Sequence, residues 1–197
     1  MKHQAPLLVG CLAILAPSAV HAETYFEFGG GLTLPVSDDD YADFVDPSIA
    51  LAARIGGGGP VLGGMFSVEW APLAADPANF SLNRFRLLGH LVFHHRITPK
   101  AEFVGRVGLG IDVIHSHYEV DTVIGRVEGS DSDAGLAIEM AGGVWFRVGT
   151  GTTQVGVELA LPIGIHNKDG NALDPDDQTF DYTSIDLQIL GGVRLRL

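Results

Sequence analysis

The chain is poor in cysteine, in basic residues and in long hydrophobic runs. Its 197 residues include one cysteine, Cys11, and 12 lysines and arginines against 24 aspartates and glutamates, which gives a formal net charge of −12. Neutralising nucleic-acid phosphates requires clustered cations, so this charge balance excludes nucleic-acid binding. After residue 22 no apolar run approaches the roughly 18–20 residues of a membrane-spanning helix. Yet 46% of the residues are hydrophobic, and their distribution in short runs is typical of β-strands.

The first 22 residues have the three parts of a secretory signal peptide. Lys2 and His3 give a short positive region, residues 7–16 are apolar, and Val20-His21-Ala22 places small residues at the two positions that a signal peptidase reads. We therefore predict a cleaved signal peptide at 1–22, followed by an exported mature domain at 23–197.

A competing interpretation of the N-terminus is lipid attachment. Leu8-Val9-Gly10-Cys11 has the form of a lipobox, which would place a lipid on Cys11. Only about five apolar residues precede this cysteine, short of the roughly 7–15 in an ordinary signal. Cleavage after Ala22 is favoured, and it leaves a mature chain without a thiol, which suits an oxidising compartment.

Eight segments of the mature chain alternate apolar residues with small or polar ones. They lie at 24–34, 48–56, 61–72, 82–95, 101–115, 134–148, 153–165 and 183–197. One face of each segment is apolar, as in Val107, Leu109 and Ile111. The other face is small and charged, and it carries seven acids and seven bases: Glu27, Arg54, Glu69, Arg84, Arg86, Glu102, Arg106, Asp112, Glu139, Arg147, Glu158, Asp186, Arg194 and Arg196.

This distribution of charge decides the architecture. A soluble sandwich would bury its apolar face, put its charges in water and leave long edges to protect. In a membrane barrel the apolar face meets lipid, the polar face points inward, and closure pairs every backbone group. Balanced interior charges are expected to form ion pairs, because an unpaired buried charge is very costly. We predict an all-β fold, an eight-stranded antiparallel up-and-down transmembrane β-barrel, with a soluble sandwich as the alternative.

The connections between the segments alternate in length. They are long at 35–47, short at 57–60, medium at 73–81, short at 96–100, long at 116–133, short at 149–152 and long at 166–182. Outer-membrane barrels have short periplasmic turns and longer outer loops. This phase predicts that both ends of the mature chain lie on the periplasmic side.

With these features the sequence resembles the small eight-stranded outer-membrane barrels of the OmpA and OmpX kind. The closing segment, residues 190–197, looks like the C-terminal strand signal of that family, although it ends on Leu197 where the family usually has an aromatic residue. The resemblance implies an outer-membrane location, contact with outer-membrane lipid, assembly by the barrel-assembly machinery and a monomeric state. No peptidoglycan-binding domain is expected after the barrel.

The interior charges are the first candidate site. Glu27 should lie beside Arg194 and Arg196 across the closing seam, where Arg54 joins them, and Glu69 should face one of two arginines, Arg84 or Arg86. Eight strands leave an interior just wide enough to be filled by side chains, which favours a plugged core. A gated path for ions is the alternative.

The acidic outer loops are the second candidate site. They hold most of the negative charge, including Asp38, Asp39, Asp40, Asp174, Asp176 and Asp177, with further acids between 119 and 133. Carboxylate oxygens suit Ca²⁺ and Mg²⁺, although the spacing of a calcium loop is incomplete. A solvated face is the simpler interpretation, and no other cofactor is predicted.

Histidines near the outer strand end raise the question of catalysis. Some outer-membrane barrels are lipid A-modifying hydrolases with a serine, a histidine and a glutamate at this height. Ser116 should point away from His115 and His117, however, and a nucleophile must lie within hydrogen-bond reach of its base. We therefore predict no enzymatic activity and a structural or surface-interaction role. A narrow pore for ions or small solutes and a lipid A-modifying hydrolase remain the alternatives.

Overall fold

The computed structural model describes residues 23–37, 45–75, 80–122, 125–167 and 181–197. They form eight long strands and one short strand, β2, which pairs with β4. The strands are β1 (Glu23–Pro35), β2 (Val45–Asp46), β3 (Ser48–Gly58), β4 (Leu62–Ala75), β5 (Phe80–Arg96), β6 (Ala101–Thr122), β7 (Gly125–Arg147), β8 (Thr153–Asn167) and β9 (Asp181–Arg196). The predicted signal peptide lies outside the described residues.

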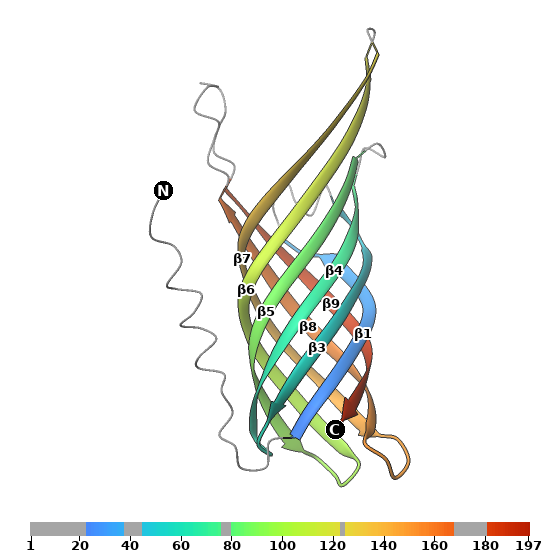
Figure 1. The fold of residues 1–197 in the computed structure, drawn as a ribbon, viewed down its shortest axis with the longest axis vertical. Coiled ribbons are helices and arrows are strands. Elements are labelled where there is room, and N and C mark those ends of the chain that lie inside the picture. The colour runs from blue at the N-terminus through green and yellow to red at the C-terminus, as the bar shows by residue number, and fades with distance from the viewer. Residues whose placement is uncertain (1–22, 38–44, 76–79, 123–124, 168–180) are drawn as a thin grey trace.

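Each long strand pairs antiparallel with the next long strand, and β1 closes the barrel by pairing with β9 (Figure 1). Cross-strand partners at this seam include Tyr25 with Arg196 and Glu27 with Arg194. The predicted eight-stranded up-and-down barrel is confirmed. None of the described residues belongs to a helix long and apolar enough to cross a membrane.

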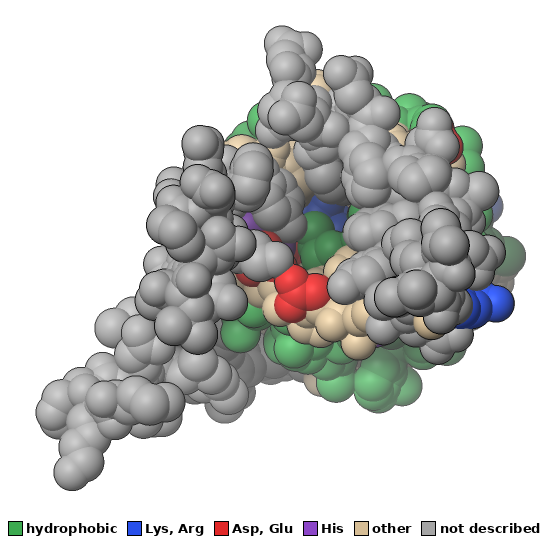
Figure 2. Space-filling view, turned by 90° about the horizontal axis from the view of Figure 1, so that it is seen from above, with side chains coloured by type: hydrophobic (Ala, Val, Ile, Leu, Met, Phe, Trp, Pro, Cys, Tyr) green, Lys and Arg blue, Asp and Glu red, His purple; other side chains and the backbone are tan. Residues whose placement is uncertain are grey.

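Side chains alternate between the two faces of the wall, as expected for β-strands. On β6, Leu109 is 61% exposed on the outside, whereas Asp112 is fully buried inside. Viewed from above, hydrophobic side chains lie around the outside of the wall, and charged side chains are visible within the ring (Figure 2). An apolar outside and a charged inside are the reverse of a soluble protein and match a barrel that faces lipid.

The interior also holds two groups of packed apolar side chains. One group lies toward the end where β1 begins and contains Tyr25, Met65, Val92, Val104 and Trp145. The other lies toward the opposite end and contains Val45, Ala50, Ala52, Ala71, Leu73, Leu82, Ile114 and Leu190. The barrel interior therefore contains both charged side chains and packed apolar side chains.

The two ends of the barrel differ (Figure 1). At the turn end, β1 begins, β9 ends, and short connections at 59–61, 97–100 and 148–152 join neighbouring strands. Gly149 has a φ of +65° in one of these turns, a left-handed conformation that favours glycine. At the opposite, outer end, β6 and β7 rise above the other strands as a hairpin.

This outer hairpin corrects the predicted long loop at 116–133. Pairing of β6 with β7 continues from His115 and Ser132 to Thr122 and Gly125, so that only residues 123–124 lie between the two strands. Beyond the lipid a hairpin needs no apolar face. Its strands therefore lack the alternation on which the prediction depended. Asp131 and Asp133 accordingly belong to β7 and not to a loop.

Candidate functional site: the barrel interior and the outer rim

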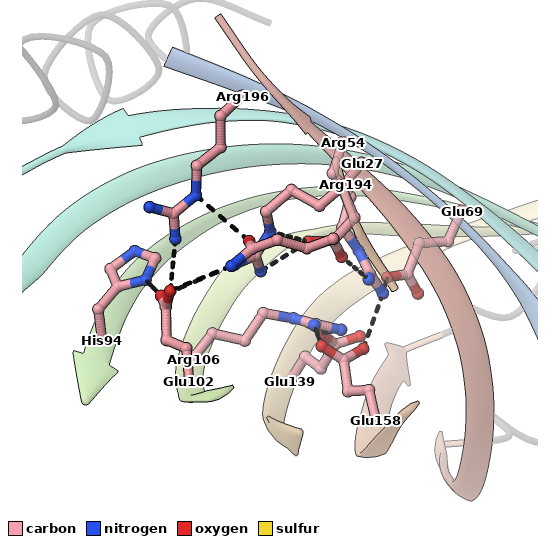
Figure 3. Close-up of polar contacts among 11 residues, drawn as sticks. Glu27, Arg54, Glu69, His94, Glu102, Arg106, Glu139, Glu158, Arg194 and Arg196 are labelled. Carbon is pink, nitrogen blue, oxygen red and sulfur yellow. Dashed lines mark hydrogen bonds and ion pairs between the residues drawn. The ribbon is translucent and has the colours of Figure 1, made fainter. Parts of the chain in front are cut away.

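A network of ion pairs fills the middle of the barrel (Figure 3). Its centre is Arg54 on β3, whose Nη1 lies 2.5 Å from Glu27 Oε1. Arg54 Nη2 lies 3.4 Å from Glu69 Oε1 and 3.2 Å from Glu158 Oε1. Arg194 on β9 pairs with the second oxygen of Glu27 at 2.8 Å. One buried arginine thus joins three carboxylates from three strands.

Arg106 on β6 extends this central network. It lies 2.8 Å from Glu139 on β7 and pairs with Glu158 on β8. Because both carboxylates are buried, leaving either one unpaired would carry a large desolvation cost. The central network therefore runs around the wall, from β1 through β3 and β4 on one side and from β6 through β8 on the other.

Arg196 lies apart from Glu27, the neighbour that the sequence suggested. It pairs with Glu102 on β6 and lies 2.7 Å from Glu23 Oε2. Glu102 also accepts a hydrogen bond from His94 Nδ1 at 2.5 Å. Arg196 is the last residue of β9, so it reaches the turn end, below the level of Glu27. A cavity of about 250 Å³ opens there and is lined by Glu23, Tyr25, Gly58, Gly59, Pro60, His94, Arg96, Glu102 and Arg196.

A second network lies in the outer half of the barrel. Arg84 and Arg86 on β5 each lie 2.6 Å from Asp186 Oδ2 on β9. Both also pair with Asp112 on β6. Glu69 faces Arg86 across the two strands as predicted, but its ion pair is with Arg54. The long side chains of Arg84 and Arg86 instead reach across the lumen to Asp186.

His166 is a member of the outer network that the sequence did not suggest. Its Nε2 lies 3.3 Å from Asp112 Oδ2, and its Nδ1 lies 2.9 Å from Asp133 Oδ2. The alternation of inward and outward side chains along β8 could have identified His166. Counting by twos from Glu158 through Ala160 leads to residue 166, and all three side chains point inward and are buried.

Arg147 lies outside the interior, contrary to the prediction. It shares the inward phase of Trp145 but is the last residue of β7, and its side chain is exposed. Trp145 is buried to 1% exposure, and Arg194 stacks on its ring at 4.3 Å. Alternation correctly gives the face of Arg147 but cannot show that the strand ends before the side chain enters the lumen.

The proposed divalent-cation residues Asp38, Asp39, Asp40, Asp174, Asp176 and Asp177 lie outside the described residues. Within the described part of the chain, no three His, Cys, Asp or Glu side chains gather as a metal site. Calcium or magnesium binding by these loops stays a prediction.

Two serine–histidine pairs occur in the described structure. Ser67 Oγ lies 2.8 Å from His90 Nε2, and His90 Nδ1 lies 3.9 Å from Glu139. All three side chains are at most 1% exposed, so a substrate has no access to them. At the outer end, Ser132 Oγ lies 2.8 Å from His115 Nδ1. The described contacts of His115 include no carboxylate to orient it as a catalytic base.

Comparisons of the sequence with known proteins give no relative. No family model matches the sequence, and no curated protein matches it.

Several solved structures match the fold. Neisserial surface protein A is 8% identical, with 90% of this chain and all of that chain covered and a TM-score of 0.60. A major outer membrane protein from Thermus thermophilus is 11% identical, with 90% and 100% coverage and a TM-score of 0.61. Ail, the attachment invasion locus protein of Yersinia pestis, solved with the heparin analogue sucrose octasulfate, is 14% identical, with 89% and 100% coverage and a TM-score of 0.52. The chain therefore has the fold of the small eight-stranded outer-membrane β-barrels.

Proposed function

We propose that this protein is a sealed anchor in the outer membrane that presents the β6–β7 hairpin and the acidic loops to a partner outside the cell. The observation that carries the proposal is the contrast between the two ends of β6 and β7. Inside the barrel these strands contribute side chains to buried ion pairs, and beyond it, within the described part of the chain, their backbones pair only with each other.

The interior contacts support a closed lumen. The eight-stranded wall leaves room for little more than its own side chains. Large groups such as Trp145, Leu88 and Arg194 are at most 1% exposed. Opening a path would require breaking ion pairs such as that between Arg54 and Glu27, which is costly for buried charges.

The outer hairpin supports a role in surface interaction. The ladder between β5 and β6 ends at Tyr118, and that between β7 and β8 begins at Leu136. From residue 119 to residue 128 the hairpin therefore has no neighbouring strand on either side among the described residues. A barrel needs no such extension to cross a membrane, so we assign it to contact with a partner.

The charge of the chain bears on the chemistry of that partner. Ail was solved with a sulfated polyanion, whereas this chain has a net charge of −12. Charge complementarity governs the encounter of partners. We therefore propose a cationic or neutral partner, and we expect no binding to heparin-like polyanions.

Replacing residues 119–128 by Asn-Gly tests the assignment. Tyr118 and Gly129 are directly paired, and Asn-Gly closes such a hairpin in two residues. The variant should fold as a barrel, seen as a heat-sensitive shift in gel mobility, and whole cells that carry it should lose binding to cationic surfaces. A matched control replaces the short turn at 149–152, which lies at the opposite end. Undiminished binding by a folded truncation variant would refute the role of the hairpin.

A narrow pore is the second candidate, and one observation favours it. Buried polar atoms such as Thr33 Oγ1, Glu69 Oε2 and Gln188 Oε1 have no hydrogen-bond partner among the described residues. Such atoms are usually satisfied by water, and water in the lumen would ease the passage of small ions. The two candidates differ in conductance, because a sealed anchor is silent in a planar bilayer.

A further inference from the structure

Two histidines lie on one face of β6 just above the apolar belt of the barrel. His115 and His117 continue the outward series of Ile111 and Val113, and both side chains are accessible to solvent. Residues two apart on a strand project in the same direction with Cα atoms about 6.6 Å apart. The two imidazoles can therefore lean toward a common ion.

A hydrogen bond orients the first of these rings. His115 Nδ1 lies 2.8 Å from Ser132 Oγ on β7. When Nδ1–H donates to this oxygen, Nε2 carries the lone pair that can bind a metal. Metal-binding histidines usually use their second ring nitrogen in this way, and the contact fixes both tautomer and orientation.

The cross-strand neighbours of the two histidines are uncharged. Asn83 and Ser132 flank His115, and Ser81 and Ser130 flank His117. Asn83 Oδ1 is itself held by Trp70 Nε1 at 3.3 Å. None of these four neighbours carries a positive charge that would repel a cation. Their hydroxyl and amide groups can hydrogen-bond to metal-bound water.

We propose that His115 and His117 together chelate one divalent transition-metal ion of the Zn²⁺, Cu²⁺ and Ni²⁺ class. Imidazole nitrogen suits these borderline ions, whereas Ca²⁺ and Mg²⁺ prefer carboxylate oxygen. Water completes the coordination sphere, because the protein supplies two ligands and not the four of a closed structural site. The site is distinct from the acidic loops in its ligand chemistry.

The test measures Zn²⁺ binding to the protein purified from membranes in detergent without a polyhistidine tag. Isothermal titration calorimetry is done in millimolar Mg²⁺, so that carboxylate sites are already filled. We expect one Zn²⁺ per chain, and a loss of affinity of about tenfold or more in His115→Ala and in His117→Ala. Ser132→Ala should weaken binding by about tenfold, as is usual for removing a partner of a metal-binding histidine.

A single exposed histidine provides the matched control. His95 stacks on Phe93 at the turn end, far from β6 residues 115–117, and His95→Ala should leave Zn²⁺ binding unchanged. Because the substituted side chains lie outside the packed interior, all variants should keep the gel mobility of the folded barrel. With Cu²⁺ as probe, electron paramagnetic resonance should show coupling to two nitrogens. Equal affinity in wild type, His115→Ala and His117→Ala, or one Zn²⁺ per two chains, would overturn the proposal.

Discussion

Replacing Arg54 by methionine should destabilise the folded barrel by about 3–5 kcal/mol, the usual cost of removing one partner from a buried ion pair. Methionine keeps much of the aliphatic length of arginine and removes its charge. The Arg54 side chain is 1% exposed, so water cannot readily replace the guanidinium.

The contacts of Arg54 identify the carboxylate that causes this loss. In the Arg54→Met variant, Glu27 still has its ion pair with Arg194, at 2.8 Å, and Glu158 still has its ion pair with Arg106. Glu69 loses an ion pair of 3.4 Å and has no other among the described residues. Removing its charge as well, in Arg54→Met with Glu69→Gln, should reduce the cost to about 1–3 kcal/mol, the range for buried polar groups left without a hydrogen bond.

Urea titration in lipid vesicles, followed by tryptophan fluorescence and by gel mobility, measures these differences. Arg147→Met removes an exposed arginine at the end of β7 and should change stability by less than about 0.5 kcal/mol. If Arg54→Met is no more destabilising than Arg147→Met, or if the added Glu69→Gln substitution brings no recovery, the central network is not a set of dry, paired charges.

Three further predictions concern the wall and the turns. Leu109→Arg places a charge midway along the lipid face of β6, where Leu109 is 61% exposed, and should cost about 2–4 kcal/mol in vesicles, whereas Val148→Arg near the end of the wall should cost about 0–1 kcal/mol; equal costs in the same urea assay would argue against a lipid-facing belt. Gly156→Ala places a Cβ 2.5 Å from the Trp145 ring and 2.7 Å from the Val144 carbonyl oxygen and should cost about 1–3 kcal/mol by overpacking, visible as a lower urea midpoint. An unchanged midpoint would show that both the ring and the backbone shift at little cost. Gly149→Ala should cost about 1–2 kcal/mol because φ is +65°, while Gly151→Ala in the same turn meets no atom within 4 Å and should be neutral. Identical urea midpoints for these two variants would contradict the argument from backbone strain.

The architecture was predictable because lipid imposes a simple rule on each strand. Residues such as Val107, Leu109 and Ile111 alternate with small or charged ones, and only a closed barrel places such a pattern in a membrane. The upper parts of β6 and β7 extend beyond the pairing with β5 and β8 and obey no such rule. Their extension to Thr122 and Gly125 therefore left no apolar signal in the sequence.

The sequence predicts which side chains point into the barrel better than it predicts which ion pairs they form. Alternation indicates that Glu69, Arg84 and Arg86 point inward, and neighbouring strands place Glu69 beside Arg86. Partner choice depends on how far each side chain reaches across the lumen, however. Arg84 and Arg86 bind Asp186 on the far side of the barrel, and only the three-dimensional arrangement determines such contacts.

The histidine contacts at the outer end illustrate the same limit. The sequence indicates that Ser116 and His115 face opposite ways, and in the structure Ser116 Oγ bonds the carbonyl of Asp131 instead. The serine that does reach His115 is Ser132, 17 residues away on the neighbouring strand. The pairing of Ser132 with His115 cannot be derived from the sequence, because residues 116–133 lack the apolar alternation that indicates strands.

Single-channel conductance in a planar bilayer tests the sealed interior most directly. The mature protein, purified from membranes and shown to be folded by its gel mobility, is added at high salt with and without millimolar Ca²⁺. The ion-paired lumen predicts no discrete openings in either condition. Regular, salt-dependent openings from the folded protein would contradict the sealed anchor and would make the narrow pore the better account of its function.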